Sequence, residues 1–194
     1  MNVAVIGDKN VGKTTLIQLF LSPHERVQPT PTLMLDTYSF MFRIGLKKKI
    51  RIHITEISLD KCLMLAGPHL RNIDLAVVVY DVTRPDRYFM VKEWFKLLEA
   101  YPPRACIVVC SKNDCIVPSI PGPSVENYIE TYKRLGWSLS HIRVNPYKYS
   151  LFTSQFINTV SKIYTRNVPK KEVPVAWRPV VLTASEPKWE CSIL

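Results

Sequence analysis

Apolar residues along this chain follow two patterns. Short continuous runs rich in β-branched residues are typical of strands buried on both faces of a parallel sheet, and they cover residues 2–6, 74–80 and 105–110. Longer segments place apolar residues at helical spacing, and they lie near 15–21, 86–100, 124–135 and 151–164. The alternation of these two patterns predicts strands joined by helices.

Three further segments complete the predicted sheet. Residues 36–44 and 49–57 alternate apolar and polar positions, which predicts an antiparallel hairpin at a sheet edge, and 138–145 predicts a last strand. The expected fold is therefore α/β, a six-stranded, mostly parallel sheet with helices on both faces. Ligands of such sheets bind beyond the carboxyl ends of the strands.

The composition is that of one ordinary globular domain with a tail. The chain has 194 residues, of which 47% are hydrophobic and 22% charged. Residues 1–165 carry the periodic elements, whereas 166–194 are punctuated by prolines and predict an extended, flexible tail. Because the chain opens on a strand, we expect no secretory signal. We therefore expect the five cysteines to lie in a reducing compartment. Cys106 and Cys110 fall in a buried-looking strand and are expected to be core residues, and the spacing of Cys110 and Cys115 does not favour a metal site.

The stretch between the first strand and the first helix carries the clearest chemistry. Gly7-Asp8-Lys9-Asn10-Val11-Gly12-Lys13-Thr14 has the pattern G-x-x-x-x-G-K-[S/T] of a phosphate-binding loop. Its backbone N–H groups and the helix N-terminus attract phosphate, the lysine reaches the outer phosphates, and the threonine offers Mg²⁺ a hydroxyl. The expected contacts to nucleotide come from Gly7, Asn10, Val11, Gly12, Lys13, Thr14 and Thr15.

The net charge of +10 raises the question of a polyanionic partner. The densest basic patch, at 47–51, lies at the predicted hairpin turn, and no aromatic-interleaved nucleic-acid signature accompanies it. We expect no nucleic-acid partner, and a membrane-facing role uses the charge more economically.

In its order of elements and motifs, the chain resembles the small GTPases of the Ras superfamily, nearest to the Rab and Ras branches. The resemblance covers about residues 2–165 and implies a small G-domain of the P-loop NTPase fold that binds GTP or GDP with Mg²⁺. Thr32 matches the switch I threonine that completes the Mg²⁺ shell, with Thr30 as a nearby alternative. Glu56 stands where the family has an aspartate, so the implied metal residues are Thr14, Thr32 and Glu56.

The guanine-recognition element is similar to the family's N-K-x-D. It reads Ser111-Lys112-Asn113-Asp114, and the Asp114 carboxylate would accept the guanine N1–H and 2-amino hydrogen bonds that adenine does not offer. The resemblance implies that Ser111 loosens the packing of this loop, that Lys112 lies along the base, and that Lys148 stands in the later S-A-K element.

Switch II departs from the family. Leu59 replaces the glycine of D-x-x-G-Q and Asp60 replaces the glutamine that orients the attacking water. Lys9 occupies a position that relatives keep small, and Glu25, beside Arg26, replaces the aromatic that stacks on guanine. We therefore expect GTP binding with slow or absent hydrolysis. The alternatives are a pseudo-GTPase interaction module that does not cycle and, less favoured, a small P-loop kinase.

The last four residues read Cys191-Ser192-Ile193-Leu194, a C-a-a-X box whose final leucine favours geranylgeranyl. Such a lipid on Cys191 would make the protein peripheral on the cytoplasmic face of a membrane, where the switch regions would meet effectors and regulators. This combination predicts a membrane-associated regulator of signalling or vesicle traffic.

Overall fold

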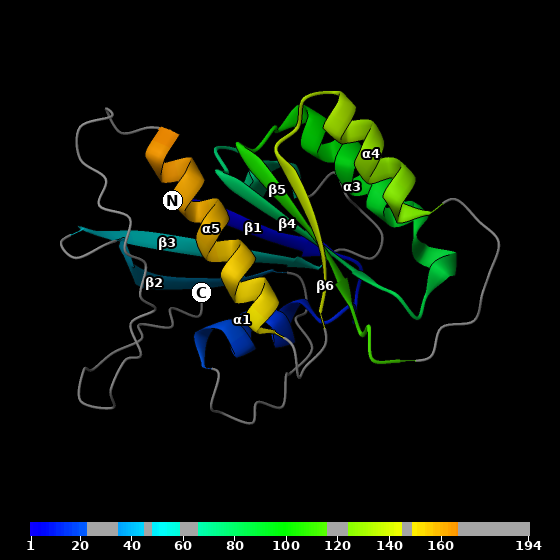
Figure 1. Ribbon diagram of the computed structural model, residues 1–194, viewed down its shortest axis with the longest axis horizontal. Coiled ribbons are helices and arrows are strands. Elements are labelled where there is room, and N and C mark those ends of the chain that lie inside the picture. The colour runs from blue at the N-terminus through cyan, green and yellow to red at the C-terminus, as the bar shows by residue number, and fades with distance from the viewer. Residues whose placement is uncertain (23–34, 45–47, 59–65, 116–123, 145–148, 167–194) are drawn as a thin grey trace.

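In the computed structural model, the described part of the chain comprises residues 1–22, 35–44, 48–58, 66–115, 124–144 and 149–166. These residues form a six-stranded sheet in the order β2-β3-β1-β4-β5-β6 (Figure 1). The strands are β1 (Asn2–Gly7), β2 (Leu35–Ile44), β3 (Lys48–Ser58), β4 (Leu75–Asp81), β5 (Ala105–Ser111) and β6 (Leu139–Arg143). Only the edge pair β2–β3 is antiparallel, so the predicted fold and the hairpin at its edge are confirmed.

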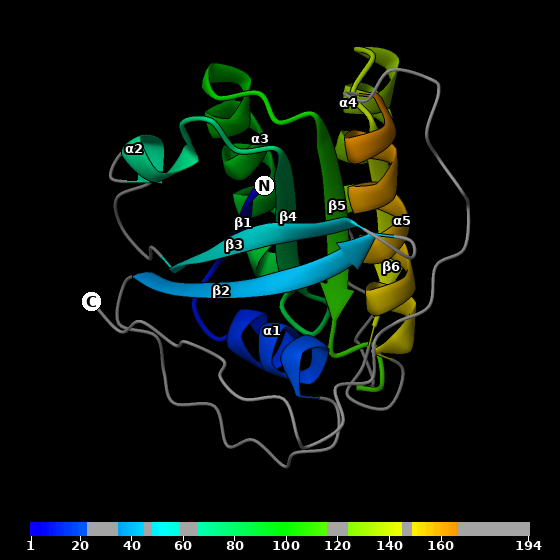
Figure 2. The same ribbon diagram turned by 90° about the vertical axis from the view of Figure 1, so that its left-hand side faces the viewer.

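Helices cover both faces of this sheet (Figure 2). They are α1 (Lys13–Leu21), α2 (Gly67–Leu70), α3 (Phe89–Ala100), α4 (Val125–Arg134) and α5 (Ser150–Arg166), with the 3₁₀ turn η2 (Pro85–Arg87) before α3. The periodic segments of the sequence predict all of them except α2, which is a single turn and too short to show a helical period.

The third helix begins later than the sequence pattern predicts. The segment from residue 85 first forms the 3₁₀ turn, closed by N–H groups of Arg87 and Tyr88 that donate to the carbonyls of Arg84 and Pro85. These bonds span three residues, whereas α-helical bonds span four. The regular helix therefore starts at Phe89 instead of at 86.

The core consists of two apolar layers, one on each face of the sheet. On one face α1 and α5 pack through Leu16, Ile17 and Phe156, and on the other α3 packs through Trp94 and Phe95, all 5% exposed or less. The central strands β4 and β5 are buried at every position, because neighbouring strands and helices enclose them.

Two of the cysteine predictions fall on described strands. Cys106 and Cys110 lie on β5, are each 1% exposed, and burial raises the pKa of both thiols. Both are core residues, as expected. Among the described residues, no helix combines the length and apolar character needed to cross a bilayer.

Candidate functional site

The phosphate-binding loop leaves β1 and enters α1 at the carboxyl edge of the sheet. Gly7 has φ +157°, and a Cβ there would lie 2.3 Å from the carbonyl oxygen of Val79, so only glycine permits this approach of loop to strand. Gly12 has φ +93° and is the N-cap of α1, while Asn10 is also left-handed at φ 61°. These left-handed positions curl the backbone ahead of the helix N-terminus, the arrangement that attracts an anion.

Lys13 is folded over this loop. Its side chain is buried, with the residue 3% exposed, and Nζ donates to the carbonyls of Gly7 at 3.3 Å and Asp8 at 2.8 Å. It also donates to Ser58 Oγ at the end of β3, at 3.1 Å. A buried ammonium beside a phosphate-binding loop is suited to bind the outer phosphates of a nucleotide.

The two described residues of the predicted metal set lie together. Thr14 Oγ1 donates to Glu56 Oε1 at 2.7 Å, and Glu56 is 1% exposed on β3. The β1–β3 register places Glu56 beside Val5, so the carboxylate projects near the start of α1. A hydroxyl and a carboxylate are hard oxygen donors of the kind Mg²⁺ prefers, and the residues present therefore fit that ion.

Ser111 ties the predicted base-recognition loop to the phosphate loop. Its Oγ lies 2.6 Å from the carbonyl oxygen of Val11 and 2.9 Å from that of Tyr80, and the residue is 7% exposed. The sequence predicted that serine in place of asparagine would loosen this loop. In the structure the Ser111 hydroxyl lies within hydrogen-bonding distance of both carbonyls and links the end of β5 to the phosphate loop.

Lys112 is anchored by a carboxylate that the sequence analysis did not single out. Its Nζ lies 2.6 Å from Asp81 Oδ2, and Asp81 Oδ1 accepts from the Thr83 amide at 2.9 Å and hydroxyl at 2.6 Å. Burial alone would raise the pKa of Asp81, but the hydrogen bonds from Lys112 and Thr83 outweigh burial and lower it. With φ 56°, the Lys112 backbone turns the chain so that Asp114 follows on an exposed loop.

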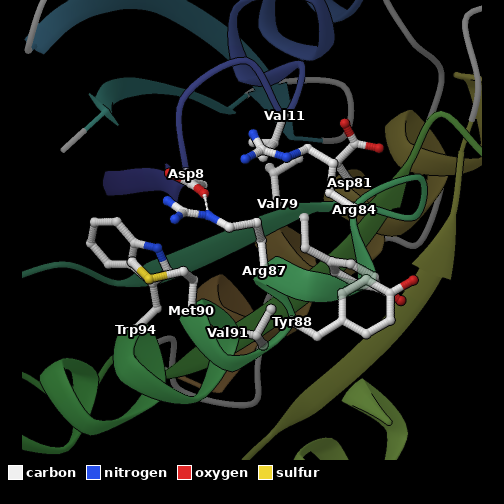
Figure 3. A pocket seen from close by; sticks show the side chains of 11 residues that line it. Asp8, Val11, Val79, Asp81, Arg84, Arg87, Tyr88, Met90, Val91 and Trp94 are labelled. Atoms are coloured by element: carbon white, nitrogen blue, oxygen red, sulfur yellow. Dashed lines mark hydrogen bonds and ion pairs between the residues drawn. The ribbon is translucent and has the colours of Figure 1, made fainter. Parts of the chain in front are cut away.

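A second carboxylate was also missed. Asp8, which is 3% exposed, accepts the Lys9 amide at 2.9 Å and the Arg87 Nε–H at 2.6 Å. Asp8 and Arg87 line a small cavity of about 10 Å³, to which Trp94 also contributes. Figure 3 shows the ion pair between the phosphate loop and the start of α3. This contact joins residues 79 positions apart.

The missed residues leave only a faint signal in the sequence. Asp81 ends an apolar strand at the edge where ligands of parallel sheets bind, and that position is the one signal in the sequence that could have identified it. Nothing in the pattern pairs Asp8 with Arg87 or Lys13 with Ser58, because each pair is distant in sequence.

Several predicted site residues lie outside the described residues. These are Thr32 with its alternative Thr30, the pair Glu25 and Arg26, the switch II residues Leu59 and Asp60, Lys148, and Cys191. Thr15 lies on α1 and is half-buried. The described residues thus bring together Gly7 to Thr14, Glu56 and Ser111 at one edge of the sheet.

Comparison with known proteins identifies a family whose members include GTP-binding proteins. Residues 2–133 match the sequence model of the Ras family. The chain is 24% identical over 134 residues to the Ras-related protein Rab-31 of Homo sapiens, covering 68% of this chain and 69% of that protein. It is 25% identical over 170 residues to the GTP-binding protein ypt4 of Schizosaccharomyces pombe, covering 86% of this chain and 72% of that one. It is also 26% identical over 117 residues to Ras-related protein Rab-22A of Mus musculus, covering 59% of each. The family match spans more than half of the chain and covers the phosphate loop and strands β1 to β5, and the chain therefore belongs to the Ras family.

Proposed function

We propose that this protein binds GTP and GDP with Mg²⁺ at the phosphate loop, hydrolyses GTP slowly or not at all, and regulates signalling or vesicle traffic from a membrane surface. The observation that carries the proposal is the Thr14–Glu56 contact of 2.7 Å beside the buried Lys13. A hydroxyl, a carboxylate and an ammonium converge there at a helix N-terminus, which suits a magnesium-bound polyphosphate. Family membership supports the guanine nucleotide as ligand.

The roles of the chain's own residues follow from their chemistry. Lys13 and the N–H groups of the loop would hold the phosphates, and Thr14 and Glu56 would hold Mg²⁺ or a water bound to it. The bound ion would neutralise phosphate charge. Asp114 would select guanine, with Thr32 and Lys148 as proposed further contacts.

Slow hydrolysis is inferred from the residues at switch II. Asp60 has a carboxylate where a glutamine amide would donate to and orient water, and a carboxylate beside a phosphate anion is repelled. Lys9 is exposed on the phosphate loop, where a long side chain would crowd an incoming arginine from a partner protein.

Membrane attachment is proposed from the C-terminus. Cys191 would carry the prenyl group, and residues 166–194 would act as a tether beyond the domain of residues 1–165. One prenyl chain attaches only marginally, so the net charge of +10 would supply the second attraction to an anionic bilayer.

Binding of fluorescent GDP, a non-hydrolysable GTP analogue and ATP to the full chain tests this function. We expect Mg²⁺-dependent binding of both guanine nucleotides and at least about a hundredfold weaker binding of ATP. The Asp114→Asn variant should lose guanine affinity, whereas the matched Asp86→Asn variant, at the exposed turn before α3, should not. Equal affinity for ATP and GTP would overturn the proposal, as would the absence of any nucleotide binding.

Measurements of GTP turnover and of conformational change distinguish a slowly hydrolysing switch from a pseudo-GTPase that does not switch. Single-turnover hydrolysis at the rate of an ordinary glutamine-containing relative would contradict slow hydrolysis. The substitution of the switch II glycine by Leu59 favours the second candidate, a pseudo-GTPase that binds nucleotide without switching. Amide hydrogen exchange in segments 30–36 and 57–70, measured with GDP and with the GTP analogue, distinguishes the two candidates. Only in a protein that switches should the protection of these amides differ between the two bound nucleotides.

A further inference from the structure

Ser58 lies beside the phosphate loop although no motif includes it. It is the last residue of β3, is 8% exposed, and pairs in the parallel β1–β3 register with Gly7, the first residue of the loop. Because side chains alternate along a strand, Ser58 projects to the same face as Glu56, which contacts Thr14. Its hydroxyl is thus on the side of the sheet edge where Lys13 and Thr14 lie.

Among the described residues, the Ser58 hydroxyl accepts a hydrogen bond and donates none. Its Oγ accepts the Lys13 Nζ–H at 3.1 Å. Among the residues that the structure describes, no acceptor lies within hydrogen-bonding distance for the hydroxyl's own hydrogen. A nearly buried hydroxyl with an unused donor, next to a buried ammonium, suits a ligand that carries only acceptor oxygens and negative charge. A phosphate group is such a ligand.

We propose that Ser58 determines the preference for the triphosphate by donating its hydroxyl hydrogen to the terminal phosphate of GTP. This inference rests on the proposed function. The terminal phosphate is the one assigned because Ser58 Oγ contacts Nζ of Lys13, the residue that reaches the outer phosphates in a phosphate-binding loop. The Ser58 hydroxyl is a side-chain donor, so its contact with phosphate does not require a glycine at position 59, where this chain has Leu59. GDP lacks this phosphate and gains nothing from the hydroxyl.

The test compares GDP and a non-hydrolysable GTP analogue on three variants of the full chain. Ser58→Ala and Ser58→Cys both remove the hydroxyl, the second at nearly the original size, and Ser58→Thr keeps it. For the first two we expect affinity for the GTP analogue to fall about tenfold or more, the range of a hydrogen bond to a charged group, with affinity for GDP unchanged. The threonine variant should retain the wild-type ratio of the two affinities.

The ratio of the affinities for the GTP analogue and for GDP distinguishes a contact to the terminal phosphate from a structural role of Ser58. If Ser58 only positions Lys13, both nucleotides lose affinity together, and the proposal is overturned; an unchanged ratio in the alanine and cysteine variants also overturns it. Ser140→Ala, on β6 and remote from the loop, is the matched control and should behave as wild type. Melting temperatures identify any variant that fails to fold. If Ser58→Ala or Ser58→Cys does not fold, the affinity ratio of the other one tests the proposal. If the wild-type chain binds neither nucleotide, the proposed function itself fails, and that result is recognised before any variant is made.

Discussion

Arg87 donates its Nε–H to the buried carboxylate of Asp8 at 2.6 Å, and this contact ties the phosphate loop to the turn that begins α3. The Asp8 side chain is 4% exposed and that of Arg87 is 32% exposed, so the pair is partly shielded from solvent. Asp8 also accepts the Lys9 amide, and the ion pair therefore acts on the backbone of the loop as well as on α3.

Replacing Arg87 with methionine should destabilise the fold by about 2 kcal/mol, because it leaves the buried Asp8 carboxylate without its guanidinium. Nucleotide affinity should fall with it, since the loop loses an anchor. Urea unfolding and GDP titration measure the two effects.

The matched control is Arg104→Met. Arg104 pairs with Asp74 at 3.2 Å, but its side chain is 51% exposed, and its loss should cost less than about 1 kcal/mol. Equal destabilisation by Arg87→Met and Arg104→Met would show that the burial of Asp8 does not strengthen the contribution of the Arg87–Asp8 pair to stability.

Asp81 should make folding stability depend on acid pH. Its carboxyl is buried but accepts hydrogen bonds from Lys112 and Thr83, which outweigh burial and lower its pKa in the folded state. A lowered folded pKa contributes stability that is fully present above the unfolded value of about 4 and is lost as the pH falls below it. Asp81→Asn should therefore lower the free energy of unfolding at pH 7. It should also reduce the loss of that free energy as the pH falls from about 5 to about 3.

Unfolding free energies of the wild type and Asp81→Asn, measured from pH 7 to about 3, check this slope. Asp86→Asn provides the comparison, because that aspartate is exposed on η2 and should leave the slope nearly as in the wild type. Parallel curves for the wild type and Asp81→Asn would contradict the assignment.

Glu56 should control the effect of Mg²⁺ on bound nucleotide. Its Oε1 accepts from Thr14, and Glu56→Gln keeps the size while removing the charge. Loss of a residue that holds a metal-bound water typically costs 10- to 100-fold in metal affinity, so the Mg²⁺ concentration that slows GDP release should rise by about that factor.

Release of fluorescent GDP over a Mg²⁺ titration gives this midpoint. Glu56→Asp should lie closer to the wild type, since it keeps the carboxylate. Glu93→Gln, at a half-buried position of α3 where the carboxylate pairs with Lys96, should not move the midpoint. A midpoint for Glu56→Gln equal to that of the wild type would remove Glu56 from the metal site.

Cys191→Ser should shift the protein from the membrane fraction to the supernatant, because it removes the thiol that would carry the prenyl group. Fractionation of cells that express each form, with mass spectrometry of the C-terminus, measures the change. Cys115→Ser, which removes an exposed thiol of the domain, should fractionate as the wild type does. Equal membrane fractions for wild type and Cys191→Ser would exclude this anchor.

Much of the fold was predictable from local pattern. The continuous apolar runs at 74–80 and 105–110 became the fully buried strands β4 and β5, because only a strand enclosed on both faces tolerates apolar residues at every position. The phosphate loop was predictable for a similar reason. Its glycines, lysine and threonine act at fixed short spacing, so the sequence alone carries their arrangement.

Contacts between distant segments were decided only by the tertiary structure. Arg87 with Asp8, Lys112 with Asp81 and Ser58 with Lys13 are brought together by the order of strands in the sheet, and no spacing along the chain encodes such pairs. Ser111 shows the same limit. As a substitution in a motif it predicted a loosened loop, yet its Oγ reaches the Val11 carbonyl at 2.6 Å, because β5 ends directly beside the phosphate loop. The sequence by itself determined which chemical groups the site contains, and the packing of strands and helices decided which of those groups meet.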